Sequence, residues 1–182
     1  MIVGVERQSR TTLDQGKARM IADYLTMEGH TNAIVLGSAA NIIWQVQTRG
    51  MFVRSGNASA TRSEMMNIIS DNPAIKRSVD LCDTKGARAT AGPAVLASAH
   101  FLISQAAKRE DADAFVFQIM EGAGMKAGNP VLYARNRLIN DRGNISHNER
   151  LELLFKAWNA SRRGEKVSRL ILTGGVLPVL EA

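Results

Sequence analysis

The stretch GPAVLASAHFLISQA, residues 92–106, decides the fold class of this chain. The Gly-Pro pair is typical of a helix start, because proline is well tolerated at the first helical position. Apolar residues then recur at helical spacing and occupy most positions up to residue 106. A helix that is apolar almost all round is a buried one. The stretch therefore predicts the central helix of a helical protein.

Three further helices are predicted after this one. Gly122 ends the first of them. Asn129-Pro130 starts the second. Ser146 and Glu149 have the spacing of a capping box and start the third, with an inner stripe of Leu151, Leu154, Phe155 and Trp158.

Two helices and a loop are expected at the start of the chain. The spacing of apolar residues favours a helix from Gly16 that ends at Gly29, and a second helix over 32–48. Residues 50–60, GMFVRSGNASA, are typical of a loop.

Two short helices and a second loop are expected before the central helix. Thr61 and Glu64 have capping-box spacing, and Asn72 is expected to cap a helix that Pro73 starts. These two helices have the rough outline of a helix-turn-helix, but their turn has no glycine and few side chains of the second helix suit base edges, which favours an ordinary helical hairpin. Residues 85–92 are polar, basic and glycine-containing, which predicts a loop.

Together these patterns predict a mainly α fold, a compact multi-helix bundle of about eight helices. The expected organisation is one helical domain over residues 1–182, with an N-terminal arm at 1–14 and an extended C-terminal tail at 165–182. The run VSRLIL, residues 167–172, fits either one short strand or an extended tail. Aromatic residues make up only 5% of the chain, which favours helices over a β-sandwich.

Several function classes are not indicated by the sequence. The single cysteine, Cys82, allows no internal disulfide, and no apolar run is long enough to span a bilayer, so a cytoplasmic protein without membrane contact is expected. The histidines at 30, 100 and 147 lack metal-ligand spacing. No nucleophile motif or dinucleotide fingerprint is present, so neither enzymatic activity nor a cofactor or metal is expected.

The most informative chemical feature is an uneven distribution of charge. The net charge is +6, and residues 126–182 carry ten Lys or Arg against five Asp or Glu. Arginine pairs well with phosphate, so a basic face is expected to bind nucleic acid without sequence specificity, DNA being the first candidate. The candidate binding residues are Arg135, Arg137, Arg142, Arg150, Arg162, Arg163, Lys166 and Arg169.

Several segments resemble one family. VERQSRTTLDQGKARMIADYLTMEGHTN at the start is similar to the segment that follows the ParB/sulfiredoxin-like domain in phage and bacterial ParB-like proteins. TRSEMMNIISDNPAIKRSV and GNPVLYARNRL resemble later stretches of that family. LLFKAWNASRRGEKVSRL is the most specific match, with Lys156, Ala157, Trp158, Asn159, Arg163 and Gly164 in place.

The resemblance implies the helical C-terminal domain of such a protein, without the preceding DGQHR-bearing domain that carries the family's chemistry. It therefore implies a non-enzymatic accessory domain and transfers no catalytic residue. Two alternatives stay open: a protein-interaction or oligomerisation module whose charge serves only solubility, and an enzyme whose site forms only with another chain.

Overall fold

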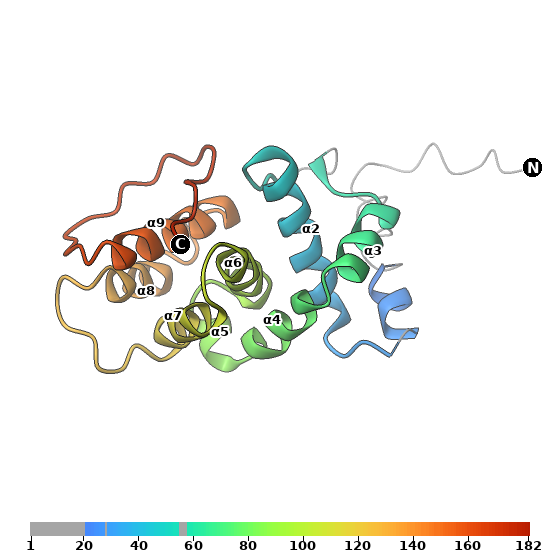
Figure 1. Ribbon diagram of the computed structural model, residues 1–182, viewed down its shortest axis with the longest axis horizontal. Helices are drawn as coiled ribbons and strands as arrows, with labels where there is room; N and C mark the ends of the chain where they lie inside the picture. The colour runs from blue at the N-terminus through green and yellow to red at the C-terminus, as the bar shows by residue number, and fades with distance from the viewer. Residues whose placement is uncertain (1–20, 28, 55–57) are drawn as a thin grey trace, which may run out of the picture.

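The computed structural model describes residues 21–27, 29–54 and 58–182, and it confirms a mainly α, compact helical bundle (Figure 1). Residues 21–27 are helical, whereas the predicted arm at 1–14 and the start of the predicted first helix lie outside the described residues. The other helices in the described ranges are α2 (Ala33–Arg49), α3 (Arg62–Asp71), α4 (Ala74–Cys82), α5 (Lys85–Ala89), α6 (Pro93–Ala106), α7 (Arg109–Glu121), α8 (Pro130–Asn140) and α9 (His147–Arg162).

Helix α6 lies at the centre of the molecule, as its sequence predicted. It packs against α2, α4, α5, α7 and α9, and Figure 1 shows it almost end-on between them. Every residue from Val95 to Ile103 is buried, including Ser98 and His100. A helix buried on all sides organises the core, because each neighbour covers a different face of it.

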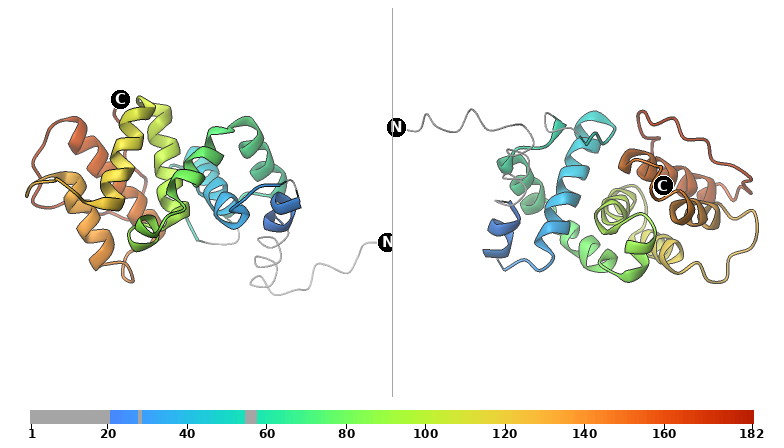
Figure 2. Two further views of the ribbon diagram at one scale, coloured as in Figure 1. Left: turned by 90° about the horizontal axis from the view of Figure 1, so that it is seen from below. Right: turned by 180° about the vertical axis from the view of Figure 1, so that it is seen from behind.

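Two groups of helices lie on either side of α6. Helices α2, α3 and residues 21–27 lie at one end, and α8 and α9 lie side by side at the other, as Figure 2 shows from two further directions. The inner stripe predicted for the last helix is confirmed, because Leu151, Leu154, Phe155 and Trp158 are all buried. Trp158 meets Phe115 of α7 edge to face, with ring centroids 5.5 Å apart.

Most of the predicted helix ends are confirmed. Thr61 with Glu64, and Ser146 with Glu149, form complete capping boxes at the starts of α3 and α9. Asn129 caps α8 by accepting from the backbone N–H groups of residues 131 and 132. Gly122 ends α7 with a φ of 74°, a conformation that glycine adopts more easily than other residues.

Two local predictions are wrong. Residues 85–92 are not a loop throughout, because Thr84 accepts from the Ala87 N–H at 3.1 Å and so starts the short helix α5. Asn72 does not cap α4; its side-chain amide instead donates to the carbonyl of Ile68 at the end of α3.

The chain after α9 is an extended segment that packs against the bundle. Within the described residues no strand is present, so the tail alternative for 167–172 holds and the strand alternative is wrong. Leu170 and Leu177 are buried, and Figure 1 shows the segment running along α9 and back towards α2. We call residues 165–182 the C-terminal strap.

Candidate nucleic-acid interface

The C-terminal strap is held by polar side chains on α9, and the buried carboxylate of Glu152 is the centre of this contact. Glu152 accepts from the Thr173 N–H and hydroxyl at 2.9 Å, from the Gly174 N–H at 2.9 Å, and from Lys156 Nζ at 2.7 Å. Burial by itself would raise the pKa of Glu152, but these donors outweigh burial and hold the pKa below its ordinary value. The hydrogen bonds from the strap therefore help to offset the free-energy cost of burying this charge.

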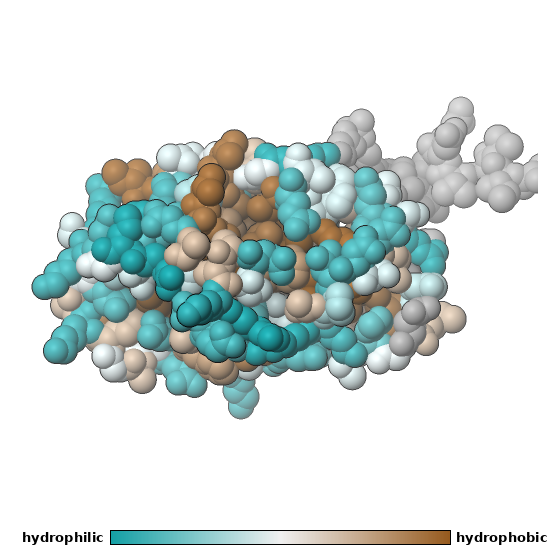
Figure 3. Space-filling model, in the orientation of Figure 1, coloured by the Kyte–Doolittle hydropathy of each residue, from teal (hydrophilic) through white to brown (hydrophobic). Residues whose placement is uncertain are grey.

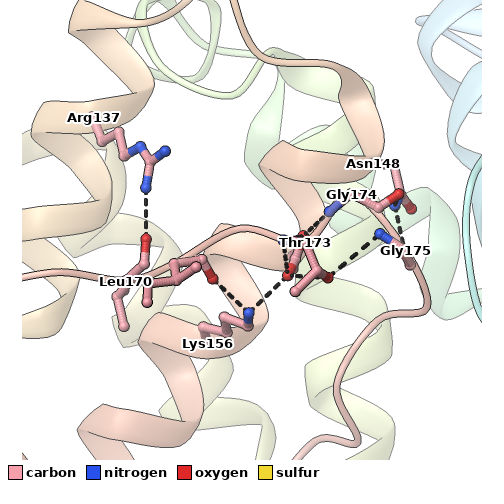
Figure 4. Close-up of polar contacts among 9 residues, drawn as sticks. Arg137, Asn148, Lys156, Leu170, Thr173, Gly174 and Gly175 are labelled. Carbon is pink, nitrogen blue, oxygen red and sulfur yellow. Dashed lines mark hydrogen bonds and ion pairs between the residues drawn. The ribbon is translucent and has the colours of Figure 1, made fainter.

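Other polar side chains of α9 bind the strap on either side of Glu152. Asn148 donates to the carbonyls of Gly174 and Gly175, as Figure 4 shows. Lys156 also donates to the carbonyl of Ile171. Asn159 donates to the Val179 carbonyl at 2.7 Å and accepts from the Glu181 N–H at 3.0 Å. These contacts fix the course of the strap along the helix.

The first part of the strap lies along α8. The Val167 N–H donates to the carbonyl of Gly128, just before α8, and Arg137 Nη1 donates to the carbonyl of Leu170 at 2.6 Å (Figure 4). Lys166 therefore lies beside the beginning of α8, and Arg169 lies beside its second half.

Three of the eight predicted binding residues are paired with carboxylates. Arg137 Nε lies 3.3 Å from Asp141, and Arg162 Nη1 lies 3.0 Å from Asp111. Arg163 pairs with Glu165 at 2.6 Å and also with Glu181. A guanidinium that already has a carboxylate partner offers less net attraction to a phosphate.

Two more of the eight are partly buried in the protein. Arg150 donates to the backbone carbonyls of Ala91 and Arg142, and its Nε is buried without a partner. Arg135 lies against Gly122, and its Nε is also buried without a partner. Arg135 is therefore a packing residue at the end of α7.

The remaining three, Arg142, Lys166 and Arg169, are exposed, and no carboxylate pairs with their side chains within the described residues. The structure adds Lys126, which lines the same surface hollow as Lys166. We call Lys126, Lys166 and Arg169 the α8 basic stripe. Figure 3 shows hydrophilic side chains over the end of the molecule where α8 and the start of the strap lie.

Arg169 lines a second, polar hollow along α8. Its other lining residues are Tyr133, Asn136, Arg137, Asn140 and Asp141. These side chains offer hydrogen-bond donors and one aromatic ring next to the stripe. Lys126 was not among the predicted binding residues, although its place in the basic final third was a signal for it.

A Ser-His-Asp arrangement inside the core resembles a catalytic triad. His100 Nδ1 lies 2.8 Å from Ser78 Oγ, and His100 Nε2 lies 2.7 Å from Asp113. Ser78 and His100 are each only 1% exposed. A nucleophile must reach its substrate, so this network is structural and connects α4, α6 and α7.

Arg77 completes this network from the surface side of α4. It binds both oxygens of Asp113, at 2.9 and 2.6 Å. Arg77 lies on α4, the second of the two helices with the outline of a helix-turn-helix, and its guanidinium is engaged in this ion pair.

Among the described residues, no group of three or more His, Cys, Asp or Glu side chains is placed to hold a metal ion. None of the helices described is both long enough and apolar enough to cross a membrane. No protein-family model matches the chain, and neither does any curated protein or solved structure. The resemblance to ParB-like proteins therefore stays a prediction.

Proposed function

We propose that this protein is a non-enzymatic domain that binds nucleic acid without sequence specificity through the α8 basic stripe. The observation that carries the proposal is the course of the strap, which brings Lys166 and Arg169 beside α8 with no carboxylate partner in the described part of the chain. An accessory domain of the ParB-like type is the biological role that fits this activity.

The dimensions of the stripe suit a nucleic-acid backbone. Helix α8 has 11 residues, which corresponds to a length of roughly 16 Å. Lys126 and Lys166 line one hollow just before α8, and Arg169 lines the hollow along its second half, so the stripe offers cations near both ends of the helix to different phosphates. Contacts of this kind fix position on the backbone and carry no sequence information.

Fluorescence anisotropy with labelled single-stranded and duplex DNA at low salt tests the proposal. Replacing Lys126, Lys166 and Arg169 together by glutamine is expected to abolish most of the binding, since each lost phosphate contact removes attraction independently of sequence. The matched control replaces Lys76, Lys85 and Lys108, which are exposed lysines on or beside α4, α5 and α7. This control has the same net charge and is expected to bind like the wild type. Absence of wild-type binding at low salt, or equal loss in both triple variants, would contradict the proposal.

A specific observation supports the alternative, a self-association module. Met27 and Ile34 are 85% and 75% exposed, and Ile34 borders an apolar hollow of about 160 Å³ near α2. Exposed apolar residues at a concave surface are typical of an interaction site. Sedimentation would reveal a dimer that Ile34→Ser dissociates if a second copy binds there, whereas a monomer at all concentrations would exclude this alternative.

A further inference from the structure

A second group of cations lies away from the α8 basic stripe, around a hollow of about 270 Å³. The hollow lies between the chain that follows α2 and the connection from α8 to α9. Its lining residues are Phe52, Arg54, Gly143, Ile145, Ser146, His147, Asn148 and Arg150. No carboxylate is among these lining residues, although Glu149 is near, in the capping box at the start of α9.

The positive groups around this hollow repel one another. Burial lowers the pKa of His147, and the charges of Arg150 and Arg54 lower it further. Burial also lowers the pKa of Arg150, and the neighbouring charge of Arg142 adds to this effect. Because Arg150 is partly removed from water, its charge beside other cations costs free energy unless an opposite charge is supplied. Within the described residues no carboxylate supplies this opposite charge, because Arg54, Arg142 and Arg150 form no ion pair there.

The central guanidinium of this group is held in place before any ligand arrives. Arg150 Nη1 donates to the Ala91 carbonyl at 3.2 Å, and Nη2 donates to the Arg142 carbonyl. His147 is positioned by an edge-to-face contact with Phe52, at 6.0 Å between ring centroids. Asn148 fixes the opposite wall by accepting from the Phe52 N–H at 2.8 Å. A site whose groups are already oriented loses little entropy when it binds.

We propose that this hollow binds a phosphate group through Arg54 and Arg150, two of its lining residues, with Arg142 next to Arg150. A phosphate is a compact anion with several acceptor oxygens, and arginine forks match its geometry. Binding would supply the missing negative charge at the point where the cations repel one another. The site uses none of the α8 basic stripe, so it does not depend on the nucleic-acid proposal.

Titration of the full chain with inorganic phosphate, against sodium chloride of equal ionic strength, tests this site. NMR of the His147 ring reports binding at the hollow, and calorimetry gives the affinity. Saturable binding with a Kd of about 1 mM or tighter is expected. Arg54→Gln is the best variant because Arg54 is exposed, and it should weaken binding about tenfold by removing one charged donor. The double variant Lys166→Gln, Arg169→Gln is the control and should bind phosphate like the wild type.

A second arm identifies the source of the phosphate. A 5′-phosphorylated dinucleotide is compared with its 5′-hydroxyl form in the same titration. If the phosphorylated dinucleotide binds more tightly than inorganic phosphate, the site is assigned to the end of a nucleic-acid strand. If the phosphorylated dinucleotide and inorganic phosphate bind equally, the site is assigned to small phosphates. No saturable binding up to about 10 mM phosphate, or an unchanged affinity in Arg54→Gln, would overturn the proposal.

Discussion

At the residue scale, Gly122 shows how a helix end and a buried arginine depend on one another. Its φ of 74° suits glycine, and a Cβ atom at this position would lie 2.6 Å from Arg135 Nε. The side chain of Arg135 therefore occupies the space that other residues would fill with their own side chain. It also places a positive charge at the C-terminal end of α7, where the helix dipole favours a cation.

Gly122→Ala is expected to destabilise the protein by about 2 kcal/mol, through an unfavourable backbone conformation and the clash with Arg135. Gly124→Ala is the matched control, because Gly124 has the same φ of 74° and no atom within 4 Å of an added Cβ. Gly124→Ala should lower the free energy of unfolding by only about 1 kcal/mol, because it has the unfavourable backbone conformation without the clash. Urea unfolding measures both. Equal losses would show that Arg135 moves away without cost.

The buried network of Ser78, His100 and Asp113 makes stability depend on pH. The Arg77 guanidinium and His100 hold the pKa of Asp113 at about 2. Burial lowers the pKa of His100 against the opposing effect of Asp113. Both pKa values are depressed in the folded state, so the unfolded chain binds these protons more readily. Stability should therefore fall as the pH drops below the ordinary value of 6.5 for histidine, and again between 3.8 and about 2 for Asp113.

Asp113→Asn tests the acid part of this dependence. The variant lacks the titrating carboxylate, so its loss of stability between pH 4 and pH 2 should be shallower than in the wild type by at most about 1.4 kcal/mol per pH unit. Urea unfolding at a series of pH values provides the comparison. Parallel curves for the two proteins would mean that Asp113 has an ordinary pKa.

At the element scale, α9 has an inner apolar stripe and a second, polar stripe that binds the strap. The polar stripe consists of Asn148, Glu152, Lys156 and Asn159, spaced three or four residues apart on one side of the helix. Only the apolar stripe was predicted from the sequence, because the helical spacing of apolar residues identifies a buried face. The partners of Glu152 in the strap, Thr173 and Gly174, lie 21 and 22 residues further along the chain, beyond any local pattern.

Glu152→Gln is expected to destabilise the protein by about 2–4 kcal/mol. The amide would remove the charge and place an N–H group against the N–H donors of Thr173 and Gly174. Glu165→Gln is the control, because Glu165 is exposed at the surface. Hydrogen exchange at Gly174 should accelerate in the first variant only. Unchanged stability in Glu152→Gln would mean that the strap is not held by this carboxylate.

The helices whose ends carry strong local signals could be predicted from the sequence. Capping boxes at residues 61 and 146, the Asn-Pro pair at 129 and the Gly-Pro pair at 92 all mark real helix starts. Helix α5 was missed because its stability depends on a close approach, in which a Cβ at Gly86 would lie 3.0 Å from Met120 Cβ. Such a contact joins residues that are far apart in the sequence, so no local sequence pattern indicates it.

At the scale of the whole molecule, the net charge of the final third was predicted but its distribution was not. Arg162 pairs with Asp111, which is 51 residues away, and Arg163 pairs with Glu181 beyond the turn of the strap. Counting charges along the sequence cannot show which are neutralised across space. In the final third of the chain, the exposed cations without a carboxylate partner among the described residues are the α8 basic stripe and Arg142, which lies next to Arg150. Fewer side chains are therefore free to bind an anion than the charge count along the sequence suggested.

The salt dependence of DNA binding tests the central claim most directly. Binding to three phosphates predicts that log K falls linearly with log salt concentration, with a slope of about −2 for single-stranded DNA. Lys166→Gln should reduce the magnitude of this slope by the share of about one phosphate contact, whereas the control Lys76→Gln should leave the slope unchanged. Binding whose affinity does not change with salt, or a slope that Lys166→Gln and Lys76→Gln reduce equally, would contradict the assignment of nucleic-acid binding to the α8 basic stripe.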